Sequence, residues 1–377
     1  MPIREVLLKK RLLVLPIVAL LAPAVSFGAR ASSTQCQVPY NNHDAYANLT
    51  PKTQDIKALH GLQGHYALPK TKKPQTLVVM FHGYGNTSNS WVCHLLDAAQ
   101  NHNAVAVAMD YRGTGWTGAA ADHRGWFVKE GAEDSIAAAQ YFLKKFPSIK
   151  NVEAFGISMG GNASGLAVAA GAKRPGTNKP LFDYWVNVEG ATSMIETYLE
   201  AQAVGATGSA FAKNAVADME KECGGTPAAQ PGCFQDITVL AQIQKIASSG
   251  IKGIVDVQGV DDGLVGHNQS EEFTWAARAM QIPTDYYIAL RRNDWQNAAS
   301  AGPEGGTTLS GTALDPVFSG AGQTYPAPLA GHGWEGSNTQ IVIATGFAKL
   351  WAIVDHNQVP ANHQYFVDGD LGTHQVF

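Results

Sequence analysis

Residues 152–161 read VEAFGISMGG, and a run of small residues at 162–172 follows them. The apolar beginning predicts a short buried strand, and the small residues predict a helix packed closely against its neighbours. Between them lies a Gly-x-Ser-x-Gly turn with Ser158 at its centre. Such a turn strains the serine backbone and lifts the hydroxyl clear of the sheet, and a side chain at Gly156 or Gly160 would crowd strand and helix. The pattern indicates an accessible nucleophilic serine.

The composition is that of an ordinary globular protein. The chain has 377 residues, of which 45% are hydrophobic and 15% charged. Its net charge of -4 offers no general attraction for nucleic acid, since Lys and Arg cluster only at the N-terminus. No metal-ligand cluster, phosphate-cradling loop, nucleotide fingerprint or other cofactor motif stands out. We therefore expect no nucleic acid partner, no metal and no cofactor, and the sequence does not indicate an oligomeric state.

The N-terminus has the order typical of a secretory signal peptide. Four basic residues precede an apolar run at 12–27, and an Ala-x-Ala pattern ends at Ala31, where we expect cleavage. A membrane anchor is the alternative, but two prolines within the run and its marginal length disfavour a permanent span. We expect residues 1–31 to be removed, leaving a soluble chain, 32–377, that is secreted or periplasmic.

Four cysteines remain after this cleavage, an even number that suits an oxidising compartment. Cys223 and Cys233 bracket a loop rich in Gly and Pro, which a local disulfide would hold together. The second pair would then be Cys36 with Cys93, tying an N-terminal arm to the first helix. Four cysteines allow three pairings, and proximity in the sequence is the only ground for preferring this one.

Strand and helix signals alternate along most of the chain. Besides the strand before Ser158, we expect buried strands at 76–81, 104–109, 184–188, 251–257 and 284–290, and helices at 126–146 and 338–354. Residues 32–74 predict a hairpin or arm. The alternation predicts an α/β fold with a mostly parallel sheet covered on both faces by helices. The stretch at about 191–249 reads as helical without strands, so we expect a cap insertion over the site within one domain.

A nucleophilic serine needs a base and an acid that orients the base. A Gly-x-x-Asp-x-x-Val register after the strand at 251–257 selects Asp262, with Asp261 as a competitor that would cap the next helix. For the base, His332 stands between glycines just before the last helix, which leaves its ring free to reach Ser158. Three of the chain's 12 histidines follow the last helix and are its rivals: His356, His363 and His374.

The oxyanion of the reaction needs backbone donors. We expect one from the N–H of Met159, directly after the nucleophile, and a second from the loop after the strand at 76–81. Tyr84 N–H is the expected second donor and Gly83 N–H the alternative, while His82 shapes the turn by bonding to its own loop. Four tryptophans fall on the predicted active-site side, where a substrate pocket and plain core packing are equal alternatives: Trp91, Trp116, Trp126 and Trp334, with Trp334 and Trp116 as our pocket candidates.

These motifs resemble those of the α/β-hydrolase superfamily. The matching segments are His82-Gly83, Gly156-x-Ser158-x-Gly160, Gly259-x-x-Asp262-x-x-Val265 and Gly331-His332-Gly333. The order serine, acid, histidine is also that of the superfamily, and the shared features run from about 76 to 354. The chain departs from the pattern at Gly266, where many relatives carry proline, and in the long loop at 291–331. The resemblance implies an α/β-hydrolase fold with a Ser158–His332–Asp262 triad.

What this resemblance implies for function is an exported esterase, lipase or depolymerase-like enzyme that forms an acyl-enzyme on Ser158. Small-molecule or polymeric esters, such as polyhydroxyalkanoates or esters of plant phenolic acids, would suit an exported enzyme. A serine peptidase is the alternative, because Gly160-Gly161 also resembles the prolyl-oligopeptidase-type catalytic domain; we expect no propeller-sized domain before the sheet, which disfavours it. A non-catalytic binding protein comes third, since all three triad residues are present.

Overall fold

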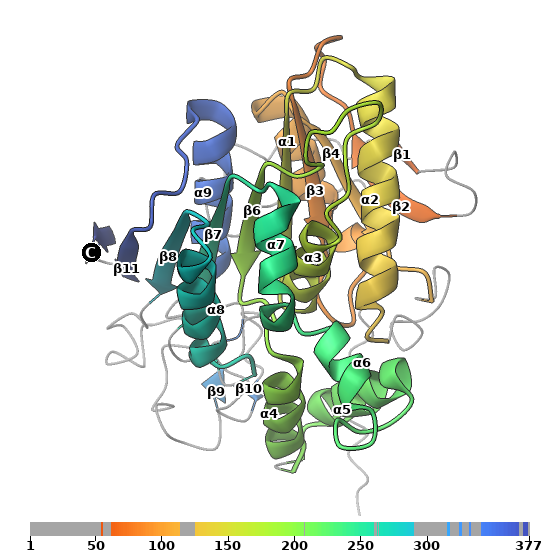
Figure 1. The fold of residues 1–377 in the computed structure, drawn as a ribbon, viewed down its shortest axis with the longest axis vertical. Helices are drawn as coiled ribbons and strands as arrows, with labels where there is room; N and C mark the ends of the chain where they lie inside the picture. Colours follow the sequence, from red (N-terminus) through yellow and green to blue (C-terminus); the bar gives the residue numbers. More distant parts are fainter. Residues whose placement is uncertain are drawn as a thin grey trace, which may run out of the picture.

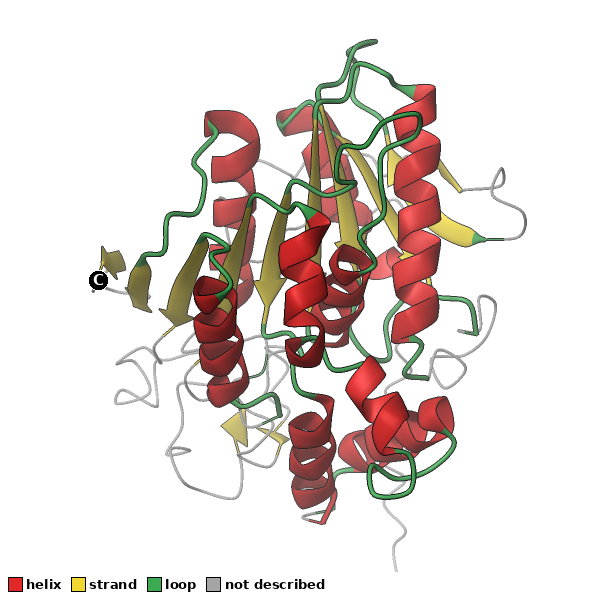
Figure 2. Cartoon of the chain, viewed as in Figure 1, coloured by secondary structure: helices red, strands yellow, loops and turns green. Residues whose placement is uncertain are grey.

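The computed structural model describes residues 54–55, 62–113, 125–206, 208–259, 262, 264–289, 315–316, 324–325, 332, 341–368 and 372–375. A ten-stranded sheet runs through this part of the chain (Figures 1 and 2). In order across the sheet its strands are β1 (Gln54–Asp55), β2 (Gln63–Ala67), β4 (Val105–Asp110), β3 (Thr76–Phe81), β5 (Asn151–Ile157), β6 (Tyr184–Val188), β7 (Gly253–Gly259), β8 (Thr284–Ala289), β11 (Gln364–Asp368) and β12 (Gly372–Gln375). Strands from β4 to β11 are parallel to their neighbours, and antiparallel strands complete both edges. A separate two-stranded ladder joins β9 (Asp315–Pro316) to β10 (Thr324–Tyr325).

Helices cover both faces of the sheet (Figure 1). One face carries α2 (Val128–Lys145), α3 (Met159–Ala169), α7 (Ile243–Ser249) and α8 (His267–Ala279), and the other carries α1 (Val92–Asn101) and α9 (Ile341–His356). A short 3-10 turn, Ser88–Trp91, leads into α1, and another, Leu240–Gln242, leads into α7.

Burial on both faces explains why the central strands are continuous apolar runs. Every residue of β3 is buried, and alternate side chains enter different cores. Leu77, Val79 and Phe81 pack on the side of α2 and α3, whereas Val78 and Met80 pack on the side of α1 and α9. The structure confirms the predicted α/β fold, a mostly parallel sheet with a layer of helices on each face.

The expected strands and helices occur with small shifts at their ends. The strands at 76–81 and 184–188 have the predicted bounds, while those expected at 104–109 and 251–257 lie one and two residues later. The expected helices at 126–146 and 338–354 are α2 and α9, and residues 338–340 lie outside the described part. Two strands of the main sheet were not expected: β11 and β12 follow the last helix and extend the sheet beyond β8. Their runs are short and mixed, and only the pairing of β11 with β8 and of β12 with β11 makes them recognisable as strands. The short β9 and β10, within the expected loop at 291–331, were not expected either.

The stretch at 191–249 is helical, as expected, but only part of it lies beyond the sheet. Helices α4 (Met194–Ala206), α5 (Ala210–Cys223) and α6 (Pro231–Asp236) gather below the carboxyl ends of the strands (Figures 1 and 2), whereas α7 packs on α3 within the helical layer. Side chains from α4, α5 and α6 belong to the same apolar core as α2 and α3: Tyr198, Met219 and Phe234 are examples. Helices α4, α5 and α6 thus share one core with the sheet domain.

A disulfide joins the end of α5 to α6, between Cys223 and Cys233. It is the expected local pair, and such bonds persist in oxidising compartments. Cys93 is also disulfide-bonded, while its expected partner Cys36 and the expected signal peptide at 1–31 lie outside the described residues. Among the described helices, none has both the length and the apolar character needed to cross a bilayer.

A buried polar network joins β6, β7 and α8. The carboxylate of Asp256, in the middle of β7, accepts hydrogen bonds from Asn187 Nδ2 (2.8 Å), Thr274 Oγ1 (3.1 Å) and Ser270 Oγ (3.3 Å). Ser270 Oγ also lies 3.0 Å from Oε1 of Gln258, which continues the network toward the end of β7. Complete burial raises the pKa of Asp256 to about 7, against the opposing effect of these donors.

This raised pKa predicts a dependence of stability on pH. Because the native state holds a proton that the unfolded chain releases, Asp256 stabilises the fold fully below about pH 4, and this stabilisation is lost as pH rises to about 7. Between pH 5 and pH 8 the free energy of unfolding should decrease by about 2–3 kcal/mol less in Asp256→Asn than in the wild type. Burial also raises the pKa values of Glu200 and Glu222 to about 7, so some slope will remain. Urea unfolding of both proteins at the two pH values measures this, and parallel slopes would contradict it.

The packing of α3 against β3 predicts a second stability effect. A Cβ added to Gly160 would lie 2.2 Å from the carbonyl oxygen of Phe81, which is backbone and cannot move away. We expect Gly160→Ala to lower the free energy of unfolding by about 3 kcal/mol or more, as overpacked sites do. Gly232, in α6, is the matched control: no atom lies within 4 Å of its added Cβ, so Gly232→Ala should change stability by about 1 kcal/mol or less. Equal effects in chemical denaturation would refute the packing argument.

Candidate active site

Ser158 occupies the turn between β5 and α3 in a strained conformation. Its φ of 57° and ψ of -125° lie outside the regions that L residues usually adopt. Two hydrogen bonds fix it there, one to the end of β6 and one from the segment after β6: Ser158 N–H donates to Val188 O at 2.9 Å, and Ala191 N–H donates to Ser158 O at 3.3 Å. The expected crowding is present too, since a Cβ on Gly156 would lie 2.2 Å from Gly160 O. Only glycine fits at these positions.

His332 lies between Ser158 and Asp262. Its Nε2 is 2.9 Å from Ser158 Oγ, and its Nδ1 is 2.8 Å from Asp262 Oδ2. The three side chains come from segments up to 174 positions apart in the sequence and meet at the carboxyl edge of the sheet. The structure thus brings together the three residues that the sequence pattern selects.

The carboxylate of Asp262 is held from several sides. Its Oδ1 accepts the backbone N–H groups of Leu264 and Val265, both at 2.9 Å, and its Oδ2 accepts from Gln258 Nε2 at 3.2 Å as well as facing His332. These hydrogen bonds compensate the burial of the carboxylate and fix its position. The network through Gln258 and Ser270 therefore connects Asp262 to the middle of the sheet. The competitor Asp261 lies outside the described residues.

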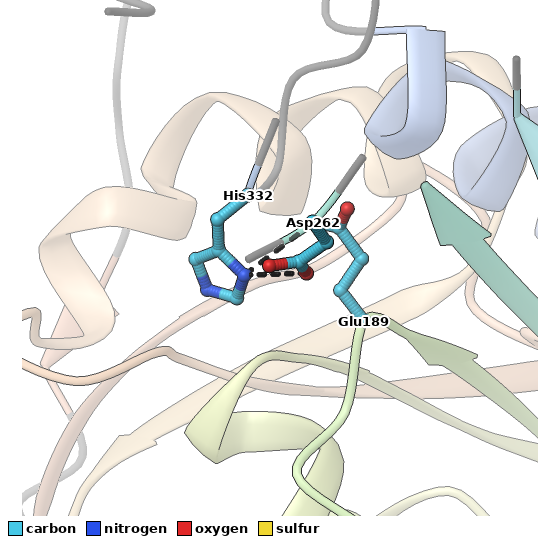
Figure 3. A group of neighbouring side chains, drawn as sticks. All are labelled: Glu189, Asp262 and His332. Carbon is cyan, nitrogen blue, oxygen red and sulfur yellow. Dashed lines mark hydrogen bonds and ion pairs between the residues drawn. The ribbon is translucent and has the colours of Figure 1, made fainter. Parts of the chain in front are cut away.

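A second carboxylate, which sequence reasoning missed, also faces His332. Glu189 follows β6 directly and is completely buried, and its Oε2 is 4.0 Å from His332 Nδ1 (Figure 3). The signal that could have found it is an acidic residue directly after a buried strand, at the same sheet edge as Ser158 and Asp262. One ligand atom from each of Glu189, Asp262 and His332 lies within 4.8 Å of the others, a spacing that a metal ion could also use. We interpret the group as a hydrogen-bonded acid–base site, because Asp262 and Ser158 already engage both ring nitrogens of His332.

Three other histidines were rivals of His332 for the role of the base. His363 directly precedes β11, and its Nδ1 lies 3.7 Å from Asp285 near the beginning of β8. Because β8 and β11 are parallel to β5, that is the edge of the sheet opposite Ser158. His356 ends α9, and the side chain of His374 is not described.

The loop after β3 lies beside Ser158. A Cβ on Gly83 would be 3.5 Å from Ser158 Cβ. His82 shapes this loop as expected, with its Nδ1 3.0 Å from Gly83 O and its ring stacked on Tyr111 at 3.9 Å. On the other side of Ser158, Met159 begins α3, and the first N–H groups of a helix have no acceptor within the helix.

Aromatic side chains connect this loop to the cap. The hydroxyl of Tyr84 donates to Asp218 Oδ2 of α5, and its ring packs edge-on against Phe211 of the same helix at 5.3 Å. Trp126 lies 5.7 Å from Tyr84, so it is on the active-site side. Trp91 is buried and packs edge-on against Phe155 and Phe347. For this residue core packing, one of the two expected alternatives, is what the structure has. The pocket candidates Trp116 and Trp334 lie outside the described residues.

Comparison with known proteins supports the fold. A family model described as serine aminopeptidase, S33, matches residues 72–180, the part from β3 through α3. None of the curated proteins matches the chain. A puromycin hydrolase variant complexed with PGG is 15% identical, with a TM-score of 0.51, covering 83% of this chain and 41% of that chain.

Two further structures show similar but lower scores. Acylaminoacyl peptidase from Pyrococcus horikoshii is 16% identical, with a TM-score of 0.46, covering 64% of this chain and 36% of that chain. An esterase from Pyrococcus furiosus is 16% identical, with a TM-score of 0.45, covering 69% of this chain and 89% of that chain. The chain thus spans less than half the length of the puromycin hydrolase and of the acylaminoacyl peptidase. With its mostly parallel sheet covered by helices on both faces and its strained serine turn between β5 and α3, the chain has the α/β-hydrolase fold.

Proposed function

We propose that this protein is an exported serine hydrolase that cleaves carboxylic esters. The observation that carries the proposal is the position of His332, whose two ring nitrogens lie 2.9 Å from Ser158 Oγ and 2.8 Å from Asp262 Oδ2. A base in contact with a hydroxyl nucleophile on one side and an orienting acid on the other is the arrangement that acyl transfer requires.

In the proposed reaction Ser158 Oγ attacks the ester carbonyl carbon while His332 Nε2 takes the hydroxyl proton. The resulting imidazolium faces Asp262, whose carboxylate holds Nδ1–H and stabilises the positive charge. The tetrahedral intermediate collapses as the C–O bond to the alcohol breaks, and His332 returns its proton to the leaving alkoxide. Water then attacks the acyl-enzyme by the same steps, with His332 as its base, and releases the carboxylic acid and free Ser158.

We assign the oxyanion donors to Met159 N–H and Tyr84 N–H, with Gly83 N–H as the alternative to Tyr84. The support is the position of these residues. Met159 begins α3 directly after Ser158, and a Cβ placed on Gly83 would lie 3.5 Å from Ser158 Cβ. Backbone donors at a helix N-terminus suit a developing negative charge. The tie between Tyr84 and Asp218 of α5 would make this loop sensitive to movements of the cap.

A serine peptidase is the second candidate. Its specific support is the description of the matching family model, serine aminopeptidase, S33, together with Gly160-Gly161 after the nucleophile. The same triad can cleave esters and amides, so the distinction lies in the leaving group and the pocket. For export, the support is the signal-peptide pattern at 1–31 and the disulfide between Cys223 and Cys233.

The test is hydrolysis of p-nitrophenyl esters with short and long acyl chains by the mature protein and by Ser158→Ala. Loss of the nucleophile removes the covalent route, so we expect kcat to fall by about 10⁶-fold, toward the rate left by binding alone. Ser248→Ala is the matched control, because this exposed serine of α7 only donates to Gln244 O at 2.8 Å. It should keep full activity.

Aminoacyl and peptidyl p-nitroanilides, assayed beside the esters, separate the two candidate functions. A kcat/KM that is higher for the p-nitrophenyl esters than for every anilide supports the esterase. Anilides cleaved faster than the esters would replace it with the peptidase. Ester hydrolysis that survives in Ser158→Ala would contradict both.

A further inference from the structure

Glu189 lies at the same edge of the sheet as Ser158 and Asp262. Ser158 follows β5, Glu189 follows the neighbouring β6, and Asp262 lies in the turn after β7. Because carboxyl ends of adjacent parallel strands meet at one edge, the two acids approach His332 from neighbouring strands, as Figure 3 shows. Glu189 is completely buried, and a buried carboxylate is unfavourable unless a charge or hydrogen bond compensates it.

The backbone of Glu189 is strained and fixed. Its φ of 47° is left-handed, an uncommon conformation for a residue with a side chain. Its N–H donates to Val257 O of β7 at 2.8 Å, while the residue before it, Val188, accepts the N–H of Ser158 at 2.9 Å. Strained residues of this kind persist where the surroundings determine them fully, and they gather at functional sites.

Close backbone packing holds the same segment from the other side. A Cβ on Gly161 would lie 2.4 Å from Gly190 Cα, so the residue after Glu189 presses directly on the first turn of α3. Asn162 Nδ2 of that helix donates to Ala191 O at 2.8 Å. Glu189 is therefore fixed to the same first turn of α3 that begins at the nucleophile.

The carboxylate of Glu189 faces the ring nitrogen of His332 that Asp262 already contacts. The distances to His332 Nδ1 are 2.8 Å from Asp262 Oδ2 and 4.0 Å from Glu189 Oε2. Four donors already surround Asp262, so its position is set by Leu264, Val265 and Gln258 as well as by the histidine. Glu189 needs to move by only about one ångström to accept the same N–H.

We propose that Glu189 is a second acid of the site, a positioning residue that holds His332 Nδ1–H together with Asp262 and takes it over when Asp262 is lost. The inference rests on the proposed function, because it assigns a role within the same site. The positive imidazolium that forms during acyl transfer faces both carboxylates, so Glu189 supports the transition state and not the binding of substrate. Its removal should therefore act on kcat and leave KM within about twofold.

The first test is a proton NMR signature that needs no substrate. An imidazole N–H bound to a carboxylate gives a low-field resonance, which His332→Gln would identify by its loss. We expect the resonance to remain in Asp262→Asn and to disappear in Asp262→Asn/Glu189→Gln. Its loss in Asp262→Asn alone, or its persistence in the double variant, would overturn the proposal. A chelator in the buffer prevents a metal ion from bridging the two acids.

The second test is kinetic. With one acid, Asp262→Asn would lower kcat by about 10⁴-fold; with Glu189 as a second acid we expect a loss nearer 10²-fold. Adding Glu189→Gln should remove a further factor of 10 or more, while Glu189→Gln alone should cost less than about 10-fold. Such non-additivity marks residues that serve the same partner. Equal factors for Glu189→Gln in both backgrounds would contradict a shared role.

Glu153→Gln is the matched control. Glu153 is also a fully buried glutamate, on β5, but it lies near Asp183 and the beginning of the strand, away from His332. It should change neither the resonance nor kcat, and thermal unfolding confirms that each variant is folded. The two failures can be told apart. If the wild-type protein hydrolyses no ester but the resonance is present, remains in Asp262→Asn and disappears in the double variant, the proposed function is refuted and the role of Glu189 stands.

Discussion

The close approach of backbone segments around Ser158 is the constraint on which the rest of the site depends. Gly156, Gly160 and Gly161 let β5, α3, β3 and the segment after β6 touch without side chains between them. Held this way, Ser158 can keep a strained conformation that would otherwise relax. The same contacts bring the loop of Gly83 beside Ser158 and fix Glu189 next to it. One packing arrangement therefore places the proposed nucleophile, the loop of the proposed oxyanion donors and a carboxylate together.

Polar contacts then extend this arrangement across the sheet. The chain of hydrogen bonds from Asn187 through Asp256, Ser270 and Gln258 to Asp262 connects the middle of β6 and β7 to the acid that faces His332. Because these groups are buried and bonded to each other, their geometry is more rigid than that of a surface loop. Asp262 is thus held by buried hydrogen bonds to β7, although it lies after the end of that strand.

The sequence predicts what local spacing determines. Ser158, Asp262 and His332 each stand in a short pattern of glycines next to an expected strand or helix, so their positions could be inferred without neighbours. Gln258 carries no such pattern, and the position of Glu189 directly after an expected strand does not by itself show that its side chain faces His332; both roles arise from contacts with residues on other elements. The same reason explains β11, which needs β8 as a partner, and Trp91, whose place in the core depends on Phe155 and Phe347. Local chemistry is visible in the sequence, whereas cross-strand support is not.

Whether Ser158 is a nucleophile activated by His332 is tested most directly by labelling the folded protein with a fluorophosphonate, followed by mass spectrometry of its peptides. We expect one adduct, on the peptide that contains Ser158, and a labelling rate that falls by orders of magnitude in His332→Ala. An adduct on another residue, or equal labelling of the His332 variant, would contradict this expectation.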